Sequence, residues 1–403
     1  MRTFIQVFGF DLAAKVLTGV FGILLIRHLP ASAFADYTYA TSLASIAAGL
    51  LTASFNRIYI VGYESLEIRE NTSSFLSVQF IFIAIIMAVT IPFWNQSPAL
   101  YWAIMGMIIA NCLLVFATTY MQQEQRFFVF SLIKLLHGVM LVAGLAGLLM
   151  LIPLAEAWQP LALRSVVMAL VFAVFVGWRL DWRGMLKVTP AARTIQRVIR
   201  QGFGGLFVYQ ALLAVFANVN ILMLRRLVED HDLATFGSAY RYYFLLVMAS
   251  SSLKSVFLPQ VQKATSKADL MKLFSTHKRM VAIYVLVVVL AIVLAPHLIP
   301  IIDKGKYPGA PLIFRILCLS AIISFVFSPF MTLLIKHKRF GVLIKMIGSA
   351  VLLNIVMSYG LITWLGINGA AMATLISYGY FQTCTFVFAR RYLDGEKPPE
   401  VES

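Results

Sequence analysis

Charge is scarce in this chain. Only 12% of its 403 residues are Asp, Glu, Lys or Arg, whereas 61% are hydrophobic. A soluble protein carries about 25% charged residues and is about half apolar. The composition therefore excludes a soluble globular protein and predicts a chain that crosses a membrane many times.

Cysteine is also rare, and enzyme motifs are missing. Cys112, Cys318 and Cys384 each lie in an apolar run with no Cys-x-x-Cys or Cys/His spacing, so we expect no disulfide and no metal site. The sequence lacks a GxxxxGKS/T loop, a GxSxG or HExxH motif and paired carboxylates. We therefore expect neither an enzyme nor a cofactor.

Apolar runs of about 17–25 residues, the length at which a helix crosses a bilayer, recur along the chain. They predict twelve spans, at residues 4–26, 37–54, 74–93, 98–120, 127–152, 161–177, 202–224, 235–257, 280–301, 312–335, 341–363 and 369–388. The loops that we place outside the cell are too short to hold a catalytic domain.

Lys and Arg gather in alternate loops, which places both termini in the cytoplasm. This bias accounts for most of the net charge of +16, so nucleic acid is not an expected partner. The two long inner loops, residues 178–201 and 259–279, are basic. Their stretches ARTIQRVIRQ and KADLMKLFSTHKRM are typical of amphipathic helices on an anionic membrane surface, with plain solvated connectors as the alternative.

An internal repeat divides the chain. Arg27-His28-Leu29 followed by Phe34-Ala35 returns about 198 residues later as Arg225-Arg226-Leu227 followed by Phe236-Gly237. Six spans per half is an even number, so the halves insert in the same orientation and a pseudo-two-fold axis along the membrane normal relates them. We expect a six-helix lobe at residues 1–177, an amphipathic linker at 178–201, a second six-helix lobe at 202–388 and a disordered cytoplasmic tail at 389–403.

Basic residues lie inside the predicted spans, although charge is costly there. They are Lys15, Lys134, Arg164, Arg241, Lys254, Arg315 and Lys345, and Asp11 is the one acid among them. Such an excess suits an anionic cargo. Lys15, Lys134 and Arg241 lie deepest, while the other four lie close enough to a span end to be snorkelling anchors.

Asp11 and Lys15 are four residues apart and share one helix face, so they can pair with each other, which does not preclude a function. As the sole acid inside a span, Asp11 is the candidate for ion coupling. Arg57 can guard the cytoplasmic mouth or be an ordinary inner-loop cation. For His137 the alternative to a switch is a hydrogen bond between helices, and Tyr240, Tyr242 and Tyr243 can stack on sugars or anchor the span at the interface.

Short elements in a fixed order carry a family resemblance. They are Leu29-Pro30, Phe34-Ala35-Asp36-Tyr37, Phe236-Gly237-Ser238-Ala239-Tyr240, Leu258-Pro259, Gly305-Lys306-Tyr307 and Gly366-Ile367-Asn368-Gly369-Ala370-Ala371. With these the chain resembles the polysaccharide-biosynthesis (Wzx-type O-antigen) flippases of the multidrug/oligosaccharidyl-lipid/polysaccharide exporter (MOP) superfamily. It departs from them at Asn218 and Asn220, where many relatives have an Asp, so a coupling role for that acid does not carry over.

The resemblance implies an all-α, MATE-like fold of twelve transmembrane helices, with a cavity between the lobes and alternating access. It also implies a bacterial cytoplasmic (inner) membrane location, an undecaprenyl-diphosphate-linked oligosaccharide as cargo, and membrane lipids and polysaccharide-assembly proteins as partners of a monomer. The residues that we expect to bind the cargo are Lys15, Lys134, Arg241, Arg57, Lys254 and Arg315, with Asp11 for ion coupling.

Other functions stay open. A multidrug exporter of the same fold would need acidic residues in its cavity, and a membrane glycan polymerase or ligase would need a larger outward loop. A peptidoglycan-precursor flippase typically has two further spans. A major-facilitator permease would carry a Gly-x-x-x-Asp-Arg-x-Gly loop after its second span, which VGYESLEIRENTSS does not match.

Overall fold

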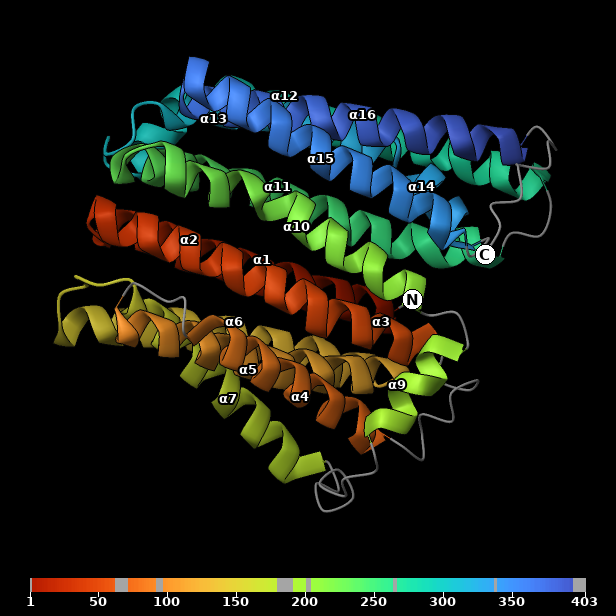
Figure 1. Ribbon diagram of the computed structural model, residues 1–403, viewed down its shortest axis with the longest axis horizontal. Helices are drawn as coiled ribbons and strands as arrows, with labels where there is room; N and C mark the ends of the chain where they lie inside the picture. The colour runs from red at the N-terminus through yellow and green to blue at the C-terminus, as the bar shows by residue number, and fades with distance from the viewer. Residues whose placement is uncertain are drawn as a thin grey trace. The chain divides into compact units, whose positions relative to one another are not determined.

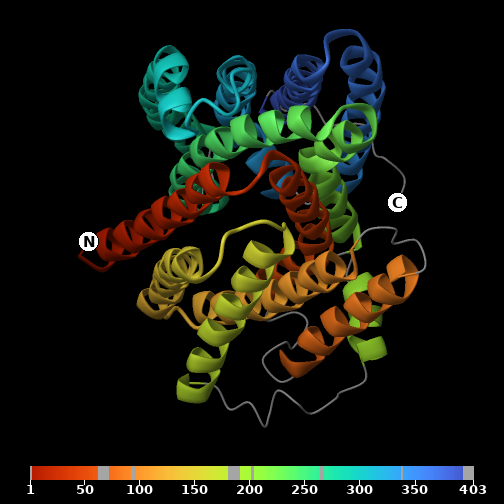
Figure 2. The same ribbon diagram turned by 90° about the vertical axis from the view of Figure 1, so that its left-hand side faces the viewer.

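A computed structural model describes residues 2–61, 72–91, 97–179, 191–200, 204–263, 267–336 and 339–393. All secondary-structure elements in these ranges are helices (Figures 1 and 2). The chain divides into two compact units, Met1–Ala214 and Val215–Ser403. The boundary falls inside a helix, later than the boundary that we place at residues 201 and 202 from the sequence.

Unit 1 contains the first ten described elements. They are α1 (Arg2–His28), α2 (Ala31–Ala48), the π-helix η1 (Gly49–Ala53), α3 (Ser54–Val61), α4 (Thr72–Thr90), α5 (Pro98–Gln123), α6 (Phe127–Leu151), α7 (Trp158–Arg179), α9 (Ala191–Arg200) and the first part of α10 (Gly204–Leu227).

Unit 2 begins within α10 and contains the remaining helices. They are α11 (Asp230–Lys263), α12 (Lys267–Ile302), α13 (Ala310–Val326), α14 (Ser328–Lys336), α15 (Phe340–Leu365) and α16 (Ile367–Leu393). The last helix continues into the segment that we expect from the sequence to be a disordered tail; residues 394–403 lie outside the described ranges.

A helix or a broken helix covers each predicted span. Among the described residues, seven helices are long and apolar enough to cross a membrane alone, or eight if the bent pair α13–α14 is one span. The axes of that pair differ by 48°. The chain is thus a multi-pass membrane protein, and the all-α prediction is confirmed.

The second span is not one regular helix, as the sequence suggests, but α2, η1 and α3 in succession. In η1 the Ser54 hydroxyl donates to the carbonyl of Gly49, five residues earlier, at 3.0 Å. Gly49 packs so closely on Ala214 that a Cβ there would collide with that side chain. Glycine is therefore the residue that this close approach requires.

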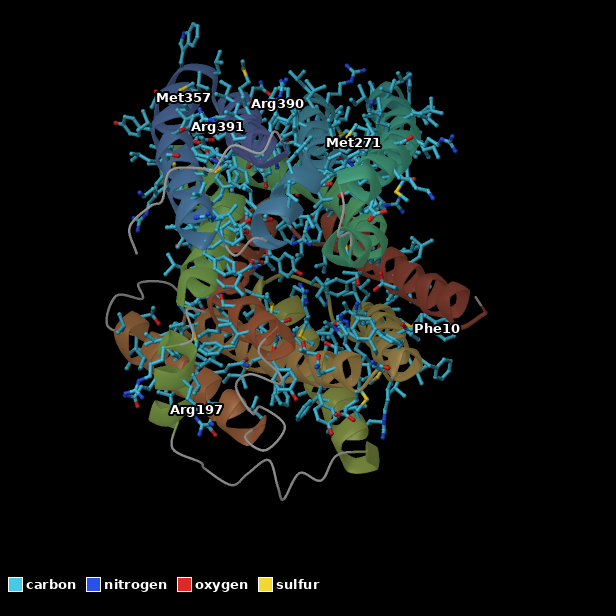
Figure 3. All side chains as sticks on the ribbon, turned by 90° about the vertical axis from the view of Figure 1, so that its right-hand side faces the viewer. Phe10, Arg197, Met271, Met357, Arg390 and Arg391 are labelled. Carbon is cyan, nitrogen blue, oxygen red and sulfur yellow. The ribbon has the colours of Figure 1, made fainter. Side chains whose placement is uncertain are left out.

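The basic inner stretch KADLMKLFSTHKRM is not a separate surface helix. It forms the beginning of α12, which runs unbroken over 36 residues and contains Pro296 and Pro300. The other inner stretch does form a separate helix, α9, which packs on α4. In α9, Arg197 is exposed (Figure 3), whereas the neighbouring Val198 is buried.

The order of packing repeats between the units. In unit 1, α5 packs against α2 and α7; in unit 2, α13 packs against α11 and α16. The aromatic pair at each second helix also repeats, with ring centroids 6.5 Å apart for Phe34 and Tyr37 and 6.2 Å apart for Phe236 and Tyr240. The repeat thus extends from the sequence into the packing.

Candidate functional site

The charged side chains of α1 and α6 meet at one carboxylate, which we call the Asp11 cluster (Asp11, Lys15 and Lys134). Lys15 Nζ lies 2.8 Å from Asp11 Oδ2, and Lys134 Nζ donates to Asp11 Oδ1 at 2.8 Å. Each carboxylate oxygen therefore has its own lysine. The side chains keep 20% (Lys15), 18% (Asp11) and 36% (Lys134) of their accessible surface, so the cluster can be reached.

Local packing places Lys134 within reach of α1. A Cβ on Gly138, one turn beyond Lys134, would lie 3.1 Å from the Leu17 side chain and 3.3 Å from the Ala14 carbonyl. Glycine therefore lets α1 and α6 approach closely at this level. The Lys134 ammonium also lies 4.0 Å from the centre of the Phe130 ring, a cation–π contact that helps to hold it in apolar surroundings.

The pairing of Asp11 with Lys15 follows from their spacing, and the structure confirms it. The third member comes from a helix 123 residues further along the chain. With all three groups ionised, the cluster has one negative and two positive charges, a net charge of +1. It can therefore offer charge-assisted hydrogen bonds to an anion, or release a lysine when Asp11 takes up a proton.

Two more basic side chains lie in unit 1 near this level. His137 follows Lys134 by one turn on α6, and Arg164 on α7 interacts with it electrostatically. His137 Nε2 and Arg164 Nε are buried and accept or donate no hydrogen bond among the described residues. The interhelical hydrogen bond expected as the alternative for His137 is therefore not formed at Nε2.

The other predicted cargo-binding residues are spread over both units. Arg57 lies on α3 and Lys254 on α11, but their side chains lie outside the described parts. Arg241 is half-buried on α11. Arg315 on α13 donates from Nε to the carbonyl of Ile292 at 3.1 Å. Of the six, the structure joins Lys15 and Lys134 in one cluster.

Unit 2 holds a neutral counterpart, which we call the Asn220 network (Asn220, Asn354, Ser358 and Thr374). Asn220 Nδ2 donates to Thr374 Oγ1 and, at 3.3 Å, to the Ala370 carbonyl. The Ser358 hydroxyl lies 2.6 Å from Asn220 Oδ1 and 2.9 Å from Asn354 Oδ1, and its single proton serves one of them at a time. All four residues are buried, and they tie α10, α15 and α16 together.

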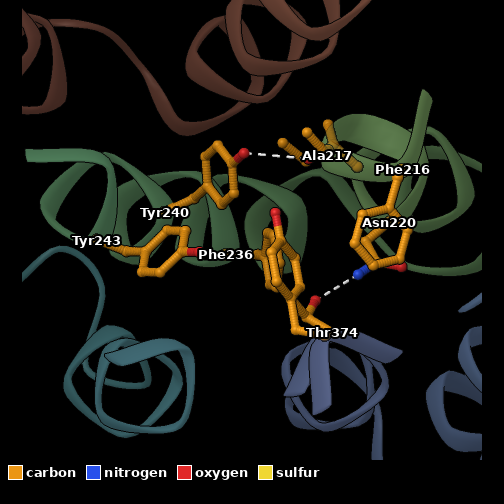
Figure 4. Close-up of a pocket in the computed structure, with 9 residues that line it drawn as sticks. Phe216, Ala217, Asn220, Phe236, Tyr240, Tyr243 and Thr374 are labelled. Atoms are coloured by element: carbon orange, nitrogen blue, oxygen red, sulfur yellow. Dashed lines mark hydrogen bonds between the residues drawn. The ribbon is translucent and has the colours of Figure 1, made fainter. Parts of the chain in front are cut away.

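A small pocket adjoins the Asn220 network (Figure 4). The space in it that a water molecule can occupy is only about 10 Å³. Its lining is aromatic and uncharged: Phe216, Ala217, Asn220, Ile221, Phe236, Tyr240, Tyr243, Thr374 and Tyr378. The Tyr240 hydroxyl donates to the Ala217 carbonyl at 3.1 Å. Tyr240 and Tyr243 therefore line this pocket together.

A second acid is buried outside the spans, between α12 and α13. Asp303 Oδ1 accepts a hydrogen bond from the Gly305 amide at 3.1 Å, whereas Oδ2 is buried with no hydrogen-bond partner in the described part of the chain. Burial raises the pKa of Asp303 above its ordinary value of 3.8, although the Gly305 amide opposes this shift. Unlike Asp11, it has no ion pair with a lysine among the described side chains.

Comparison with known proteins identifies the fold. No family model and no curated protein sequence matches the chain. Among solved structures it is similar to the lipid II flippase MurJ in an inward closed conformation, with 13% identity, a TM-score of 0.72 and coverage of 94% of this chain and 87% of that one.

It is also similar to the Vibrio cholerae MATE transporter VcmN in the bent form, with 12% identity, a TM-score of 0.62 and coverage of 98% of each chain. An outward-facing multidrug resistance MATE family transporter of the MOP superfamily matches with 12% identity, a TM-score of 0.60 and coverage of 98% and 96%. The chain therefore has the fold shared by MATE transporters and MurJ, which confirms the MATE-like prediction.

Proposed function

We propose that the protein is a flippase that carries an undecaprenyl-diphosphate-linked oligosaccharide, an O-antigen unit or another surface polysaccharide repeat unit, across the bacterial cytoplasmic membrane by alternating access. The observation that carries this proposal is the Asp11 cluster, in which one carboxylate is shared by two lysines at 2.8 Å each. Its net positive charge and partial exposure provide a place for an anionic head group.

The chemistry of the cargo explains the need for such a cluster. A diphosphate that crosses a hydrocarbon slab loses its hydration, and an unpaired charge is very costly there. When a phosphate enters, one of the two ammonium groups can turn toward it while the other stays paired with Asp11. Arg164, whose buried Nε has no hydrogen-bond partner in the described structure, adds further positive charge on the same unit.

The fold supports a transporter, and one neighbour supports a lipid-linked cargo. MurJ is described as a lipid II flippase, and its structure gives the TM-score of 0.72. Like our proposal, this description concerns a lipid-linked cargo. We propose the same broad task for the present chain, with both termini cytoplasmic, as a monomer that works with lipids and polysaccharide-assembly proteins and performs no chemical reaction.

We further propose that Asp11 couples transport to an ion gradient. A proton that arrives at Asp11 removes the negative charge that both lysines share. Lys15 and Lys134 are then released for the diphosphate, so the protonation state of Asp11 controls how many ammonium groups are free to hold the cargo. Because each carboxylate oxygen forms an ion pair with one lysine, a proton on Asp11 weakens the contacts of Lys15 and Lys134 without any intermediate residue.

A multidrug exporter of the same fold is the second candidate. Two observations favour it: the MATE transporters among the structural neighbours, and the presence of an acid, Asp11, on the first helix. The charge balance argues against it, because seven basic residues and one acid lie in the predicted spans. A cationic drug would meet a surplus of positive charge in the Asp11 cluster.

Lipid analysis of a deletion strain tests the proposal. Deletion of the gene is expected to cause one undecaprenyl-diphosphate-linked oligosaccharide to accumulate on the inner leaflet, as measured by mass spectrometry of extracted lipids. The wild-type chain should restore the profile, and the Lys15→Ala and Lys134→Ala variants should not. An unchanged lipid profile would sink the flippase proposal, and increased sensitivity to cationic drugs in the same strain would support the exporter.

A further inference from the structure

Prolines interrupt the backbone hydrogen bonds of unit 2, and two of them concern the packed helices α12 and α13. Pro296 lies inside α12, and Pro329 lies in the first turn of α14, directly after the bend. A proline has no N–H, so the carbonyl four residues earlier loses its helical partner. The two carbonyls concerned are those of Ile292 and Phe325. In a membrane such a carbonyl needs a donor from elsewhere, because lipid offers none.

Both carbonyls receive a side-chain donor from the opposite helix. Arg315 on α13 donates from Nε to the Ile292 carbonyl on α12 at 3.1 Å. His277 on α12 places Nε2 at 3.2 Å from the Phe325 carbonyl at the end of α13, and at 3.4 Å from that of Val326. Since a carbonyl can only accept, Nε2 of His277 carries a hydrogen. A side chain on α12 therefore caps the Phe325 carbonyl at the end of α13, and a side chain on α13 caps the Ile292 carbonyl on α12.

The two capping side chains, His277 and Arg315, have different surroundings. His277 is 6% exposed, and its ring centre lies 5.2 Å from that of Phe325, so it is packed against the residue whose carbonyl it caps. The Ser328 hydroxyl also donates to that carbonyl, at 2.9 Å. Arg315 is half-buried, and no second side-chain donor to Ile292 is found in the described structure. Loss of the Arg315 side chain should therefore destabilise the protein more than loss of the His277 side chain.

The two caps lie at different levels of one helix pair. Along α12 the order is His277, then Ile292; along α13 it is Arg315, then Phe325. His277 meets Phe325 and Ile292 meets Arg315, so the helices are antiparallel and joined at two levels. The pair also packs along its length. Joined at both levels, the helices cannot slide past each other without breaking a cap.

We propose that Arg315 and His277 are positioning residues that supply the donors missing at Pro296 and Pro329. They thereby fix the register of α12 and α13 and the 48° bend between α13 and α14. Under this proposal Arg315 is not a cargo ligand, although its charge inside a span makes it a candidate from the sequence. The proposal goes beyond the transport function, because the caps exist whatever the cargo is.

A double-mutant cycle on the purified full-length protein tests the Arg315 cap. Arg315→Met should lower the apparent Tm by about 3–8 °C, as expected when a buried carbonyl loses its donor. Arg315→Lys should recover part of that loss, since lysine also donates. In a Pro296→Ala background the backbone N–H returns, so Arg315→Met should lower the Tm by less than half as much.

The matched control is Pro300→Ala, one turn further along α12. Pro300 frees a different carbonyl, that of Pro296, so this change should not rescue Arg315→Met. A parallel cycle combines His277→Leu, with His277→Gln as the donor-keeping variant, and Pro329→Ala. We expect a smaller coupling there, because Ser328 still donates to Phe325.

The outcomes are distinct from those of the flippase proposal. If Arg315→Met causes the same Tm loss in the wild-type and the Pro296→Ala backgrounds, or if Pro300→Ala rescues it equally, the capping proposal is wrong. The lipid accumulation assay measures the effect of these variants on transport, and this part of the test rests on the proposed function. Pro296→Ala should restore the lipid profile of an Arg315→Met strain if Arg315 positions helices, and should fail to do so if Arg315 binds cargo.

Discussion

The Asp11 cluster and the Asn220 network occupy different units of a repeated fold and use polar groups in opposite ways. The Asp11 cluster consists of three charges, each side chain keeping between 18% and 36% of its accessible surface. The Asn220 network consists of neutral groups that are at most 7% exposed. The Asp11 cluster can exchange its ion-pair partners for a ligand or a proton, whereas the Asn220 network holds α10, α15 and α16 together.

From this difference we expect the two sites to have separate tasks. Charged side chains inside a membrane are usually paired and functional. A partly exposed ion pair can exchange one partner for an incoming ion. A buried neutral network has no charge to exchange, and breaking it leaves unpaired groups. Loss of a charge from the Asp11 cluster should therefore lower transport, whereas loss of a partner from the Asn220 network should lower stability.

The largest expected effect is on transport, from Lys15→Ala and Lys134→Ala. Each leaves one lysine paired with Asp11, so the cluster becomes neutral and the protein should still fold. Loss of one charge-assisted hydrogen bond to a diphosphate should lower transport by about 10- to 100-fold. Flipping of a lipid-linked oligosaccharide in proteoliposomes measures this. We also expect Arg241→Ala to lose export while protein levels persist.

Lys345→Ala is the matched control, because Lys345 lies in a span on α15 and its side chain is exposed. It should transport normally. If the Lys15 and Lys134 variants disappear from the membrane instead of accumulating there in an inactive form, these lysines are structural and the contrast between the units disappears.

Asp11→Asn should change how transport is driven. Without the carboxylate the two lysines stay charged at all times, so cargo release no longer responds to protons. We expect slower transport that does not depend on an imposed proton gradient, whereas the wild type depends on it. Initial flipping rates in proteoliposomes with and without the gradient test this. Normal rates of Asp11→Asn under both conditions would exclude ion coupling at Asp11.

Asn220→Ala should affect stability more than mechanism. It leaves Thr374 and Ser358 without their shared amide, at a cost of about 1–3 kcal/mol. A lower apparent Tm should accompany a nearly unchanged flipping rate per folded molecule. Thr363→Ala on α15 is the control, because its exposed hydroxyl bonds only to carbonyls of its own helix in the described structure. A loss of gradient dependence in Asn220→Ala would contradict the division of tasks.

The smallest expected effect concerns Asp303, a buried acid without a lysine ion pair in the described structure. Because its pKa is raised in the folded protein, it favours folding most below about pH 3.8, and this contribution is lost as the pH rises through the raised value. Asp303→Asn keeps an acceptor for Gly305. Its apparent Tm should equal that of the wild type at low pH and exceed it by about 1–3 °C above this window.

Thermal unfolding across a pH series measures this difference. A gap that is constant with pH would show that Asp303 does not titrate in this way. A similar experiment on Asp11→Asn provides the comparison, since the Asp11 carboxylate forms ion pairs with two lysines, whereas Asp303 interacts with Lys306 only at longer range in the described structure.

Much of the fold could be predicted from the sequence, because membrane spans are long and their apolar character is local. Each predicted span has a helix, and the Asp11–Lys15 pair follows from a four-residue spacing. The bent and broken spans could not be predicted as easily. The signal for the bend at α13–α14 is Pro329, and for the α12 defect it is Pro296, both of which are compatible with an apolar run.

Partners of charged residues that lie on other helices were harder to predict from the sequence. Lys134 joins Asp11 only because α6 packs on α1, and spacing along one helix says nothing of that. Arg315 illustrates the same limit, since its charge predicts a ligand site whereas its Nε bonds to a backbone carbonyl. Depth in a span identifies a residue that needs a partner, and only the packing of helices decides which partner it finds.

The π-helix η1 makes the second span sensitive to its length as well as to its composition. Beyond it, Phe55 packs against Phe82 and Phe207, and Tyr59 packs against Phe116. A π turn holds one residue more than an α turn, so removing one residue from Gly49–Ala53 would rotate α3 by about 100° and turn both rings away from these neighbours. A single deleted codon there should do more harm than several conservative substitutions.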